Sequence, residues 1–276
     1  MSAKILEGKK LANKILEELK AEIRKLNVQI ELAIILVGND PSSVSYVKQK
    51  QKTGDGLGVK VKIYNYKSDI STRKLRQEIN KLNKNKKING IIVQLPLPEN
   101  INTESILDAV NPIKDVDVLS RESVGRLYKN KSKILPPTVA GIIELLNAYS
   151  IDYKNKNIGI IGHGVLVGKP ASIVFANCGA SIFMVRSSTK NKEDILKQAD
   201  IIISGVGKPD LVTNDMVKND AVIIDAGTSQ KDGKLVGDVA DEVKKIASFI
   251  TPVPGGVGPM TVAMLFRNLI ELVKYK

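Results

Sequence analysis

The chain has few of the residues that build disulfides, metal sites and nucleic-acid surfaces. Its 276 residues include one cysteine, one histidine and no tryptophan, and aromatic residues make up 4%. A single cysteine, Cys178, excludes an internal disulfide, and together with one histidine it cannot complete the usual zinc ligand sets, so we expect no metal site. Nucleic-acid binding is also disfavoured, because aromatic side chains that could stack on bases are scarce.

Long apolar runs are absent too. No stretch reaches the roughly 18 apolar residues that a membrane-spanning helix needs, so no membrane partner is expected. The first residues, Met1–Gly8, contain no apolar segment of the kind found in secretory signals. The hydrophobic share of 43% and the charged share of 26% are typical of a soluble globular protein. We therefore expect a cytoplasmic location, with an organellar one after removal of a targeting segment as the alternative.

What the chain has in excess is positive charge, with a formal net charge of +13. Three interpretations compete: lysine-rich solvated faces, attraction of anionic small molecules, and nucleic-acid binding, of which the last is least favoured. The densest basic stretches, Lys81–Lys87 and Lys129–Lys133, are typical of solvated loops and helix ends.

Apolar runs alternate with amphipathic stretches along nearly the whole chain. The expected strands are Leu32–Val37, Val59–Tyr64, Gly90–Gln94, Ile158–Ile161, Ser181–Val185, Ile201–Ser204, Val222–Asp225 and Phe249–Ile250. The expected helices are Lys10–Lys25, Ser43–Leu57, Thr72–Leu82, Gly141–Tyr149, Lys169–Ala176, Glu193–Ala199 and Met260–Lys274. Several strands are continuous Val/Ile/Leu runs, as in parallel sheets buried on both faces, so the pattern predicts an α/β fold.

The length and the order of these elements predict two domains. A charged stretch that ends in two prolines, Lys129–Pro137, separates two series of strand–helix units. We expect residues 1–120 to form an N-terminal α/β catalytic domain and residues 121–254 to form a Rossmann-like dinucleotide-binding domain. The last helix is expected to return to the first domain, which would then include residues 255–276.

The segment Ile158–Pro170 has the pattern of a strand, a glycine turn and a helix. Gly162, Gly164 and Gly168 would let the backbone turn sharply and approach a pyrophosphate at the helix N-terminus. The spacing G-x-G-x-x-x-G differs from the commoner G-x-G-x-x-G, and an ordinary tight turn remains the alternative. His163, the only histidine, lies inside this turn, where a phosphate neighbour or an exposed turn residue is favoured over a catalyst.

The end of the next strand distinguishes the two nicotinamide cofactors. An acidic residue there would bind a ribose hydroxyl, whereas a cationic one accommodates a 2′-phosphate. The chain has Arg186 followed by Ser187, Ser188, Thr189 and Lys190, and no acid. Because arginine can bind phosphate through two hydrogen bonds, this favours NADP over NAD, although NAD stays possible and a solvated turn is the alternative.

Four further segments stand in a fixed order along the chain. They are Ser45–Lys52 with the pattern Y-V-x-x-K-x-K, Val93–Pro98 with V-Q-L-P-L-P, Lys114–Asp117 with K-D-V-D, and Thr251–Thr261 with T-P-V-P-G-G-V-G-P-M-T. In sequence, order and spacing they resemble the bifunctional methylenetetrahydrofolate dehydrogenase/methenyltetrahydrofolate cyclohydrolase (FolD) family, and the resemblance covers essentially the whole chain. It implies oxidation of 5,10-methylenetetrahydrofolate to 5,10-methenyltetrahydrofolate with NADP, then hydrolysis to 10-formyltetrahydrofolate.

The chemistry of the residues agrees with the resemblance. Tyr46 and Lys50 are four residues apart on a predicted helix and share one face, where the ring could stack on a pterin. Burial beside the ring would lower the lysine pKa towards neutrality and allow proton exchange. Gln94, at the carboxyl end of a strand, could hold the lysine, and Asp117 could accept hydrogen bonds from the pterin.

The resemblance assigns three sets of site residues. The catalytic set is Lys50, Gln94, Asp117 and Tyr46. The substrate-binding set is Tyr46, Val93, Leu95, Pro254, Gly255, Gly256, Val257 and Gly258. The cofactor-binding set is Gly162, His163, Gly164, Gly168, Arg186, Ser187 and Thr228.

The chain departs from the family pattern in four segments. Val118 stands where the family has glycine. A valine would be strained there if the backbone needs a positive φ. Ser123 replaces an asparagine, and Pro136–Val139 replaces P-C-T-P. Gly162–Gly164 reads Gly-His-Gly instead of Gly-Arg-Ser, which removes an arginine and a hydroxyl that help to hold NADP. The expected cyclohydrolase residues are intact, whereas cofactor affinity and NADP preference become open questions.

Several functional alternatives follow. A cyclohydrolase with weak or lost dehydrogenase activity, or an NAD-preferring enzyme, would fit the altered cofactor turn. A non-enzymatic folate- or nucleotide-binding protein, or an unrelated Rossmann dehydrogenase, would not explain Lys50, Gln94 and Asp117 together. The resemblance also implies a homodimer formed through the cofactor domain and a role in one-carbon metabolism that supplies purine biosynthesis.

Overall fold

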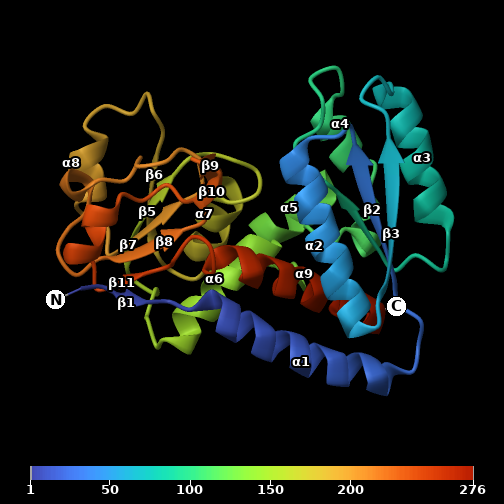
Figure 1. Cartoon of the computed structure of the whole chain (residues 1–276), viewed down its shortest axis with the longest axis horizontal. Helices are drawn as coiled ribbons and strands as arrows, with labels where there is room; N and C mark the ends of the chain where they lie inside the picture. The colour runs from blue at the N-terminus through green and yellow to red at the C-terminus, as the bar shows by residue number, and fades with distance from the viewer. Residues whose placement is uncertain (1, 276) are drawn as a thin grey trace. The chain divides into compact units, whose positions relative to one another are not determined.

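A computed structural model describes residues 2–275, which form two compact units. The three-strand unit comprises Lys14–Pro136 and the chain from Leu265 onwards. The six-strand unit comprises the chain up to Asn13 and Pro137–Met264. Each unit has a parallel β-sheet with helices, so the α/β fold expected from the sequence is confirmed (Figure 1).

The boundaries of these units differ from the expected domain limits at residues 120 and 254. The chain changes unit inside α1 (Gly8–Leu26), at the Pro136–Pro137 junction, and inside α9 (Val257–Lys274). Residues up to 136 stay with the three-strand unit because Asn268 Nδ2 donates hydrogen bonds to the carbonyls of Val116 and Leu135, at 2.9 and 2.7 Å.

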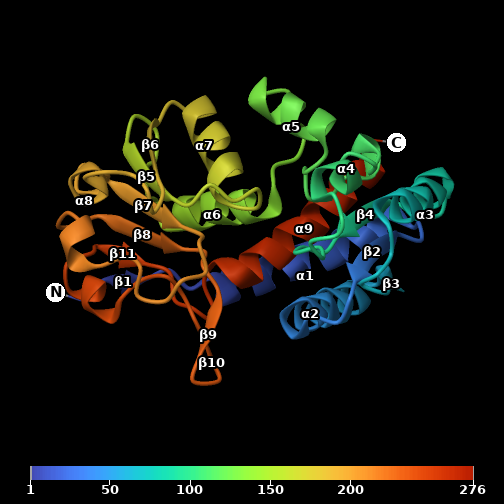
Figure 2. The same ribbon diagram turned by 90° about the horizontal axis from the view of Figure 1, so that it is seen from above.

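The three-strand unit is built on a parallel sheet in the order β3-β2-β4. Its strands are β2 (Glu31–Val37), β3 (Lys60–Tyr66) and β4 (Gly90–Val93). Its other elements are α2 (Pro41–Leu57), α3 (Thr72–Lys84), α4 (Thr103–Leu107), the 3-10 helix η1 (Pro112–Lys114) and α5 (Arg121–Tyr128). The chain crosses from β2 to β3 through α2, and then back in the other direction from β3 to β4 through α3. Because both crossovers are right-handed, α2 and α3 lie on opposite faces of the sheet (Figure 2).

Local sequence signals fix where α2 begins and ends. Asp40 Oδ2 accepts a hydrogen bond from Ser43 N at 2.7 Å, and Pro41 occupies the first turn. Gly58 ends the helix in the left-handed conformation, with φ of 82°. These two caps set the register of α2 and therefore which of its side chains face the end of β4.

The six-strand unit has an all-parallel sheet in the order β1-β11-β8-β7-β5-β6. Its strands are β1 (Lys4–Ile5), β5 (Asn157–Ile161), β6 (Ser181–Val185), β7 (Ile201–Ser204), β8 (Val222–Asp225) and β11 (Phe249–Ile250). Its helices, besides the ends of α1 and α9, are α6 (Pro137–Ala148), α7 (Gly168–Asn177), α8 (Lys192–Leu196), η2 (Asn214–Met216) and η3 (Asp241–Lys245).

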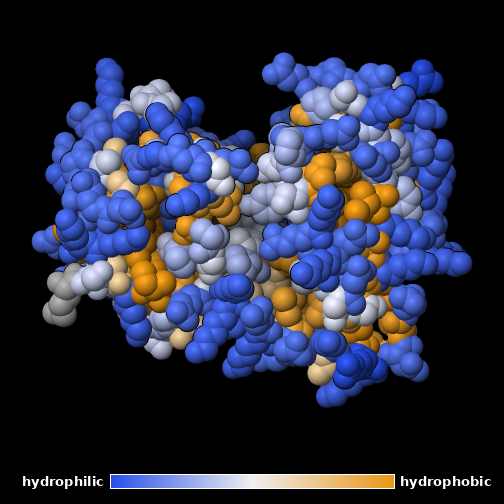
Figure 3. Space-filling view, viewed as in Figure 1, coloured by the Kyte–Doolittle hydropathy of each residue, from blue (hydrophilic) through white to orange (hydrophobic). Residues whose placement is uncertain are grey.

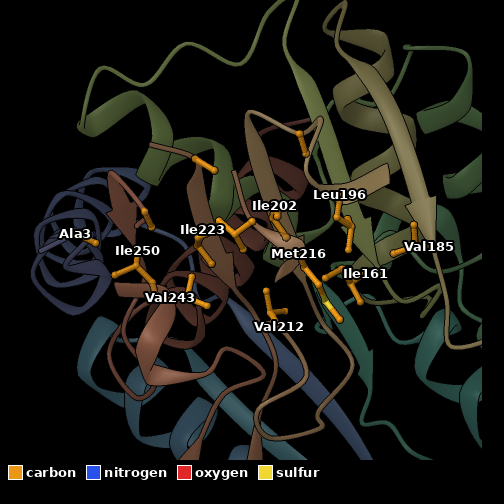
Figure 4. Packing of buried hydrophobic residues seen from close by; sticks show 14 residues of the cluster. Ala3, Ile161, Val185, Leu196, Ile202, Val212, Met216, Ile223, Val243 and Ile250 are labelled. Carbon is orange, nitrogen blue, oxygen red and sulfur yellow. The ribbon is translucent and has the colours of Figure 1, made fainter. Parts of the chain in front are cut away.

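One core of this unit lies between the sheet and α8, η2 and η3. Figure 4 shows the aliphatic side chains that meet there, among them Ile202, Ile223 and Leu196, all of which are fully buried. Burying a side chain of this size contributes about 1.5–3 kcal/mol to folding. The continuous apolar runs of the sequence are therefore the central strands of this sheet, as expected.

The structure also contains elements that the sequence patterns did not indicate. β1 pairs with β11 through Lys4 and Ile5, which places the start of the chain in the six-strand sheet. A hairpin of β9 (Ser229–Lys231) and β10 (Lys234–Val236) extends from the unit (Figure 2). Its turn, Asp232-Gly233, has φ of 52° and 73°, the conformation that favours Asp-Gly in tight hairpins.

The expected strands are all present, each within two residues of its expected bounds. Helix limits were less accurate: α6 begins four residues before its expected start, and α8 ends three residues before its expected end. Within residues 2–275, no helix combines the length and hydropathy needed to cross a membrane. The face in Figure 3 is mostly hydrophilic with scattered hydrophobic patches, in keeping with the many surface lysines.

Val118 adopts the backbone conformation that the family's glycine would favour. Its φ is 60°, and its side chain is only 1% exposed. A β-branched residue in this left-handed region is a conformational outlier, costing on the order of 1–2 kcal/mol. The burial of the Val118 side chain offsets this strain.

We predict that Val118→Gly and Val118→Ala have free energies of unfolding within about 1 kcal/mol of each other. Alanine keeps the strain and loses two buried methyl groups, at a cost of about 1.6 kcal/mol. Glycine loses one further methyl group but relieves the strain, although elsewhere it is less stable than alanine by about 1 kcal/mol. Urea denaturation of both variants provides the measurement, and a clearly larger difference between the two variants would contradict this account.

Candidate active site

The face of α2 that follows its N-terminal cap carries Tyr46 and Lys50, and both side chains are half-buried. Between them, Val47 is buried and anchors the helix in the three-strand unit. Lys50 Nζ donates a hydrogen bond to Gln94 Oε1 at 2.9 Å. The predicted pairing of the lysine with the glutamine is therefore present, and the amine does not point into open solvent.

Gln94 follows β4 directly and is held at both ends. Its backbone N–H donates to Ile35 O at 2.9 Å, which continues the ladder of the sheet for one more residue. Its side-chain Nε2 donates to Leu95 O at 2.7 Å. With the amide nitrogen engaged in this way, only Oε1 faces Lys50, so the glutamine holds the amine in one position.

Asp117 lies close enough to Lys50 for the two charges to interact. Burial raises the pKa of Asp117 to about 6, the charge of Lys50 opposes this shift, and Asp115 adds to it. Burial likewise lowers the pKa of Lys50, and the charge of Asp117 opposes that shift. Each group is thus less readily ionised than in water, as is typical of groups that exchange protons.

The segment that carries Asp117 is fixed by three neighbours that the sequence analysis did not assign to the site. Lys114 is 4% exposed, and its Nζ donates to three carbonyls at the end of α3, at 2.7–3.2 Å. Asp115 accepts hydrogen bonds from the backbone N–H groups of Leu119 and Ser120. Asn268 binds the carbonyl of Val116, so the backbone on both sides of Asp117 is held.

Among the other expected folate contacts, exposure differs widely. Val93 is buried in β4, whereas Leu95 is half-buried. Pro254 is exposed, Gly255 and Gly258 are half-buried, and Gly256 and Val257 are buried.

The proline–glycine loop belongs to the six-strand unit, where the start of α1 supports it. Lys9 N donates to Gly255 O at 2.7 Å. A Cβ on Gly8 would lie 2.0 Å from Gly256 O, so only glycine fits there. Gly255 itself has φ of 109°. The first turn of α1 was not expected to shape this loop, because the two segments are far apart in the sequence.

The loops that carry the expected cofactor residues meet at one edge of the six-strand sheet. Gly162 N donates to Val185 O, Gly205 N to Ile161 O, and Ala226 N to Ser204 O. The carboxyl ends of β5, β6, β7 and β8 are therefore adjacent. Ligands of open α/β sheets bind at this edge, where the strand order reverses around β5.

The three glycines of the turn after β5 have different structural roles. Gly162 has φ of 95°, which favours glycine. A Cβ on Gly168 would lie 2.0 Å from Gly162 O, so the start of α7 is packed against the turn. Gly164 is exposed, and a Cβ there would have no atom within 4 Å. The turn thus leaves an open space beside the N-terminus of α7, where a pyrophosphate would fit.

The remaining cofactor residues are placed as follows. Arg186, Ser187 and Thr228 are exposed. Gly162 N donates a hydrogen bond to the carbonyl of Val185, which places the next residue, Arg186, beside Gly162. Thr189 Oγ1 accepts a hydrogen bond from Arg186 N at 3.0 Å and shapes this turn. His163 is half-buried, and its Nε2 is buried without a hydrogen-bond partner among residues 2–275.

No group of three or more His, Cys, Asp or Glu side chains with the arrangement of a metal site occurs within residues 2–275. Two buried carboxylates, Asp225 and Asp238, do lie at the cofactor edge. Burial raises the pKa of Asp225 to about 6, although three backbone hydrogen bonds oppose that shift. The sequence analysis did not identify either residue.

The packing of the turn predicts contrasting effects of two alanine substitutions. Gly168→Ala places a methyl group against the Gly162 carbonyl and is expected to lower the free energy of unfolding by more than about 2 kcal/mol. Gly164→Ala meets no atom and is expected to change it by less than about 0.5 kcal/mol. Thermal and urea denaturation without cofactor tests both, and equal effects would show that the turn is not packed as described.

Comparison with known proteins identifies both halves of the chain. Residues 6–117 match the family described as "Tetrahydrofolate dehydrogenase/cyclohydrolase, catalytic domain". Residues 136–276 match the one described as "Tetrahydrofolate dehydrogenase/cyclohydrolase, NAD(P)-binding domain". The "Bifunctional protein FolD" of Nitratiruptor sp. is 44% identical over 99% of this chain and 98% of its own length. The protein of the same name from Clostridium novyi is 44% identical over 98% of this chain and 99% of its own length.

Solved structures agree. The bifunctional methylenetetrahydrofolate dehydrogenase/cyclohydrolase of Campylobacter jejuni is 40% identical, with a TM-score of 0.95 and 99% of each chain covered. The Trypanosoma brucei enzyme, solved with NADP cofactor and an inhibitor, is 32% identical, with a TM-score of 0.94, covering 100% of this chain and 98% of that one. With both domains matched in order and relatives similar over nearly its whole length, the chain belongs to the tetrahydrofolate dehydrogenase/cyclohydrolase family of bifunctional enzymes.

Proposed function

We propose that Lys50, Gln94, Asp117 and Tyr46 form the site at which this bifunctional enzyme oxidises 5,10-methylenetetrahydrofolate and hydrolyses the methenyl product to 10-formyltetrahydrofolate. The observation that carries the proposal is the hydrogen bond from Lys50 Nζ to Gln94 Oε1, 2.9 Å long, near the half-buried Asp117 carboxylate. A half-buried amine held in this way can exchange protons with a bound substrate, whereas a solvated surface lysine would stay charged.

Hydrolysis of the methenyl cation requires three proton movements. The water that attacks the methenyl carbon must lose a proton, and the ring nitrogen must gain one as its bond to this carbon breaks. The hydroxyl left on the carbon must then lose the second proton to become the formyl carbonyl, so one proton is released overall. The lowered pKa of Lys50 increases the fraction of its amine that is unprotonated and free to accept a proton, and its conjugate acid can return the proton. Gln94 keeps the amine from rotating away by accepting one of its hydrogens.

Binding of the pterin is assigned to Tyr46 and Asp117. The Tyr46 ring is half-buried one turn before Lys50 and offers a flat apolar surface for the pterin or aminobenzoate ring. The Asp117 carboxylate would accept hydrogen bonds from the amino and ring N–H groups, a pairing in which two parallel bonds fix orientation. Leu95 is assigned to the wall of the folate site. The loop of Pro254, Gly255, Gly256, Val257 and Gly258 keeps the substrate-binding role that the family resemblance implies.

The cofactor edge has a shape that fits a dinucleotide. Gly162 and Gly168 close the turn tightly, and Gly164 leaves free space where the backbone can approach a pyrophosphate. When bound, NADP supplies the acceptor for the hydride. Exposed Arg186, with Ser187, is assigned to the 2′-phosphate, and the Trypanosoma brucei relative is described as complexed with NADP.

A cyclohydrolase with weak dehydrogenase activity is the second candidate, and a specific observation favours it. His163 and Gly164 replace the family's arginine and serine in the turn, and the His163 ring has its Nε2 buried instead of directed to solvent. Arg186 would then be the main cation for the 2′-phosphate. If Arg186 does not replace the phosphate contacts of the family's arginine and serine, the enzyme would prefer NAD.

We also propose a homodimer formed through the six-strand unit, a cytoplasmic location, and supply of 10-formyl groups to purine biosynthesis. The bacterial relatives and the family resemblance support these assignments. Light scattering that gives the mass of one chain would reject the dimer.

Measuring both half-reactions with NADP and with NAD tests the proposed function. We expect methenyltetrahydrofolate, measured by its absorbance, to form faster with NADP than with NAD.

The variant Lys50→Met tests the role of the lysine. It should lower the rate of methenyl hydrolysis by roughly 100-fold or more, the scale of a lost acid–base group. Lys48→Met, which changes an exposed lysine on the same helix at a variable position of the motif, is the matched control. Undiminished hydrolysis in folded Lys50→Met would remove the lysine from the mechanism, and no oxidation with either cofactor would leave a cyclohydrolase alone.

The pH dependence of hydrolysis follows from Asp117. Its pKa of about 6 means that the carboxylate is protonated below pH 6 and loses its capacity to accept from the pterin. The value of kcat/KM should therefore rise with pH through an inflection near pH 6, after subtraction of the uncatalysed rate. Asp117→Asn should lower kcat/KM and abolish the inflection near pH 6. An inflection that survives in this variant would assign it to another group.

A further inference from the structure

Asp238 is a completely buried carboxylate at the cofactor edge of the six-strand sheet, with an exposed fraction of 0%. Its Oδ2 accepts hydrogen bonds from Ser204 Oγ at 2.6 Å and Val206 N at 2.8 Å. Its Oδ1 accepts from Gly207 N and Lys208 N, both at 2.8 Å. All four donors belong to the end of β7 and the loop that follows it, so one side chain holds the whole loop.

A second buried carboxylate, Asp225, holds Asp238 in place. It accepts hydrogen bonds from the backbone N–H groups of Asp238, Val239 and Gly227, at 3.0–3.1 Å. A Cβ on Gly227 would lie 2.1 Å from Asp238 Oδ1, and a Cβ on Gly237 would lie 2.0 Å from Asp225 Oδ2. Each carboxylate therefore occupies the space that a glycine leaves free, and neither can shift without the other.

The loop that Asp238 holds lies against the glycine turn after β5. A Cβ on Gly162 would lie 2.9 Å from the Val206 side chain, and one on Gly205 would lie 2.7 Å from Val167. Val206 is nevertheless 47% exposed, although it is apolar. Its side chain therefore borders the turn on one side and is open on the other.

Three backbone N–H groups in sequence, at residues 206–208, point inward to the carboxylate. Without it these three part-buried donors would lose their acceptor, so the loop would turn them to solvent and move away from the turn. The position of Val206 over the turn thus depends on the charge and shape of Asp238, and not on packing alone.

We propose that Asp238 is a positioning residue for cofactor binding: it fixes the loop Gly205–Lys208 so that Val206 presents an apolar surface to a dinucleotide bound at the glycine turn. This inference rests on the proposed cofactor site. Asp238 acts through the loop and does not touch the ligand, whereas Val206 makes the contact.

The test measures the dissociation constant of NADP⁺ by calorimetry for the wild type and three variants. Asp238→Asn offers an amide where four donors converge and is expected to weaken NADP⁺ binding at least tenfold, and to raise the KM for NADP⁺ more than it lowers kcat. Asp232→Asn makes the same chemical change at the exposed hairpin turn and should bind NADP⁺ as the wild type does.

Val206→Ser keeps the proposal testable if Asp238→Asn does not fold, because the Val206 side chain is half-exposed and its replacement leaves the core intact. It is expected to weaken NADP⁺ binding threefold to tenfold without a change in melting temperature. Wild-type affinity in folded Asp238→Asn, or in Val206→Ser, would overturn the inference. Absence of binding of both NADP⁺ and NAD⁺ to the wild type would instead reject the proposed cofactor site itself.

Discussion

The hydrogen bond between Lys50 and Gln94 is the contact on which the proposed chemistry depends. It joins a helix to the end of a strand 44 residues further along the chain, and it holds a half-buried amine 2.9 Å from an amide oxygen. Burial makes the charged form of this amine less favourable, while the nearby Asp117 carboxylate makes it more favourable. The balance of these two effects, and not the lysine by itself, suits the site to proton exchange.

Both units hold their buried charges with backbone groups more than with opposite charges. Lys114 donates to three carbonyls at the end of α3, and Asp238 accepts from three backbone N–H groups and a hydroxyl. Hydrogen bonds to a charged group are the stronger kind, and each backbone group satisfied in this way is also fixed in position. The two residues therefore order the segments on which Asp117 and Val206 lie.

The departures from the family pattern affect the two units differently. Val118 takes up a left-handed conformation next to Asp117, and burial of its side chain offsets the strain, so the segment that carries Asp117 is retained. At the cofactor turn, by contrast, Gly164 is open to solvent and His163 has its Nε2 buried, so two groups that elsewhere hold the cofactor have no direct substitute in the turn. Arg186 lies on the adjacent loop and is exposed.

Local patterns of residues were enough to predict the parallel sheets, because runs such as those of β2 and β7 can be satisfied only by burial on both faces. They were also enough to place Tyr46 and Lys50 on one face, since four residues make about one helical turn, and to locate the glycine turn after β5. Three other features became visible only in the folded chain: Gly8 supports the proline–glycine loop, Lys114 and Asn268 fix Asp117, and Asp225 and Asp238 hold the loop after β7. These contacts join segments far apart in the chain, and no local pattern of charge or hydropathy encodes which distant backbone groups will meet a given side chain.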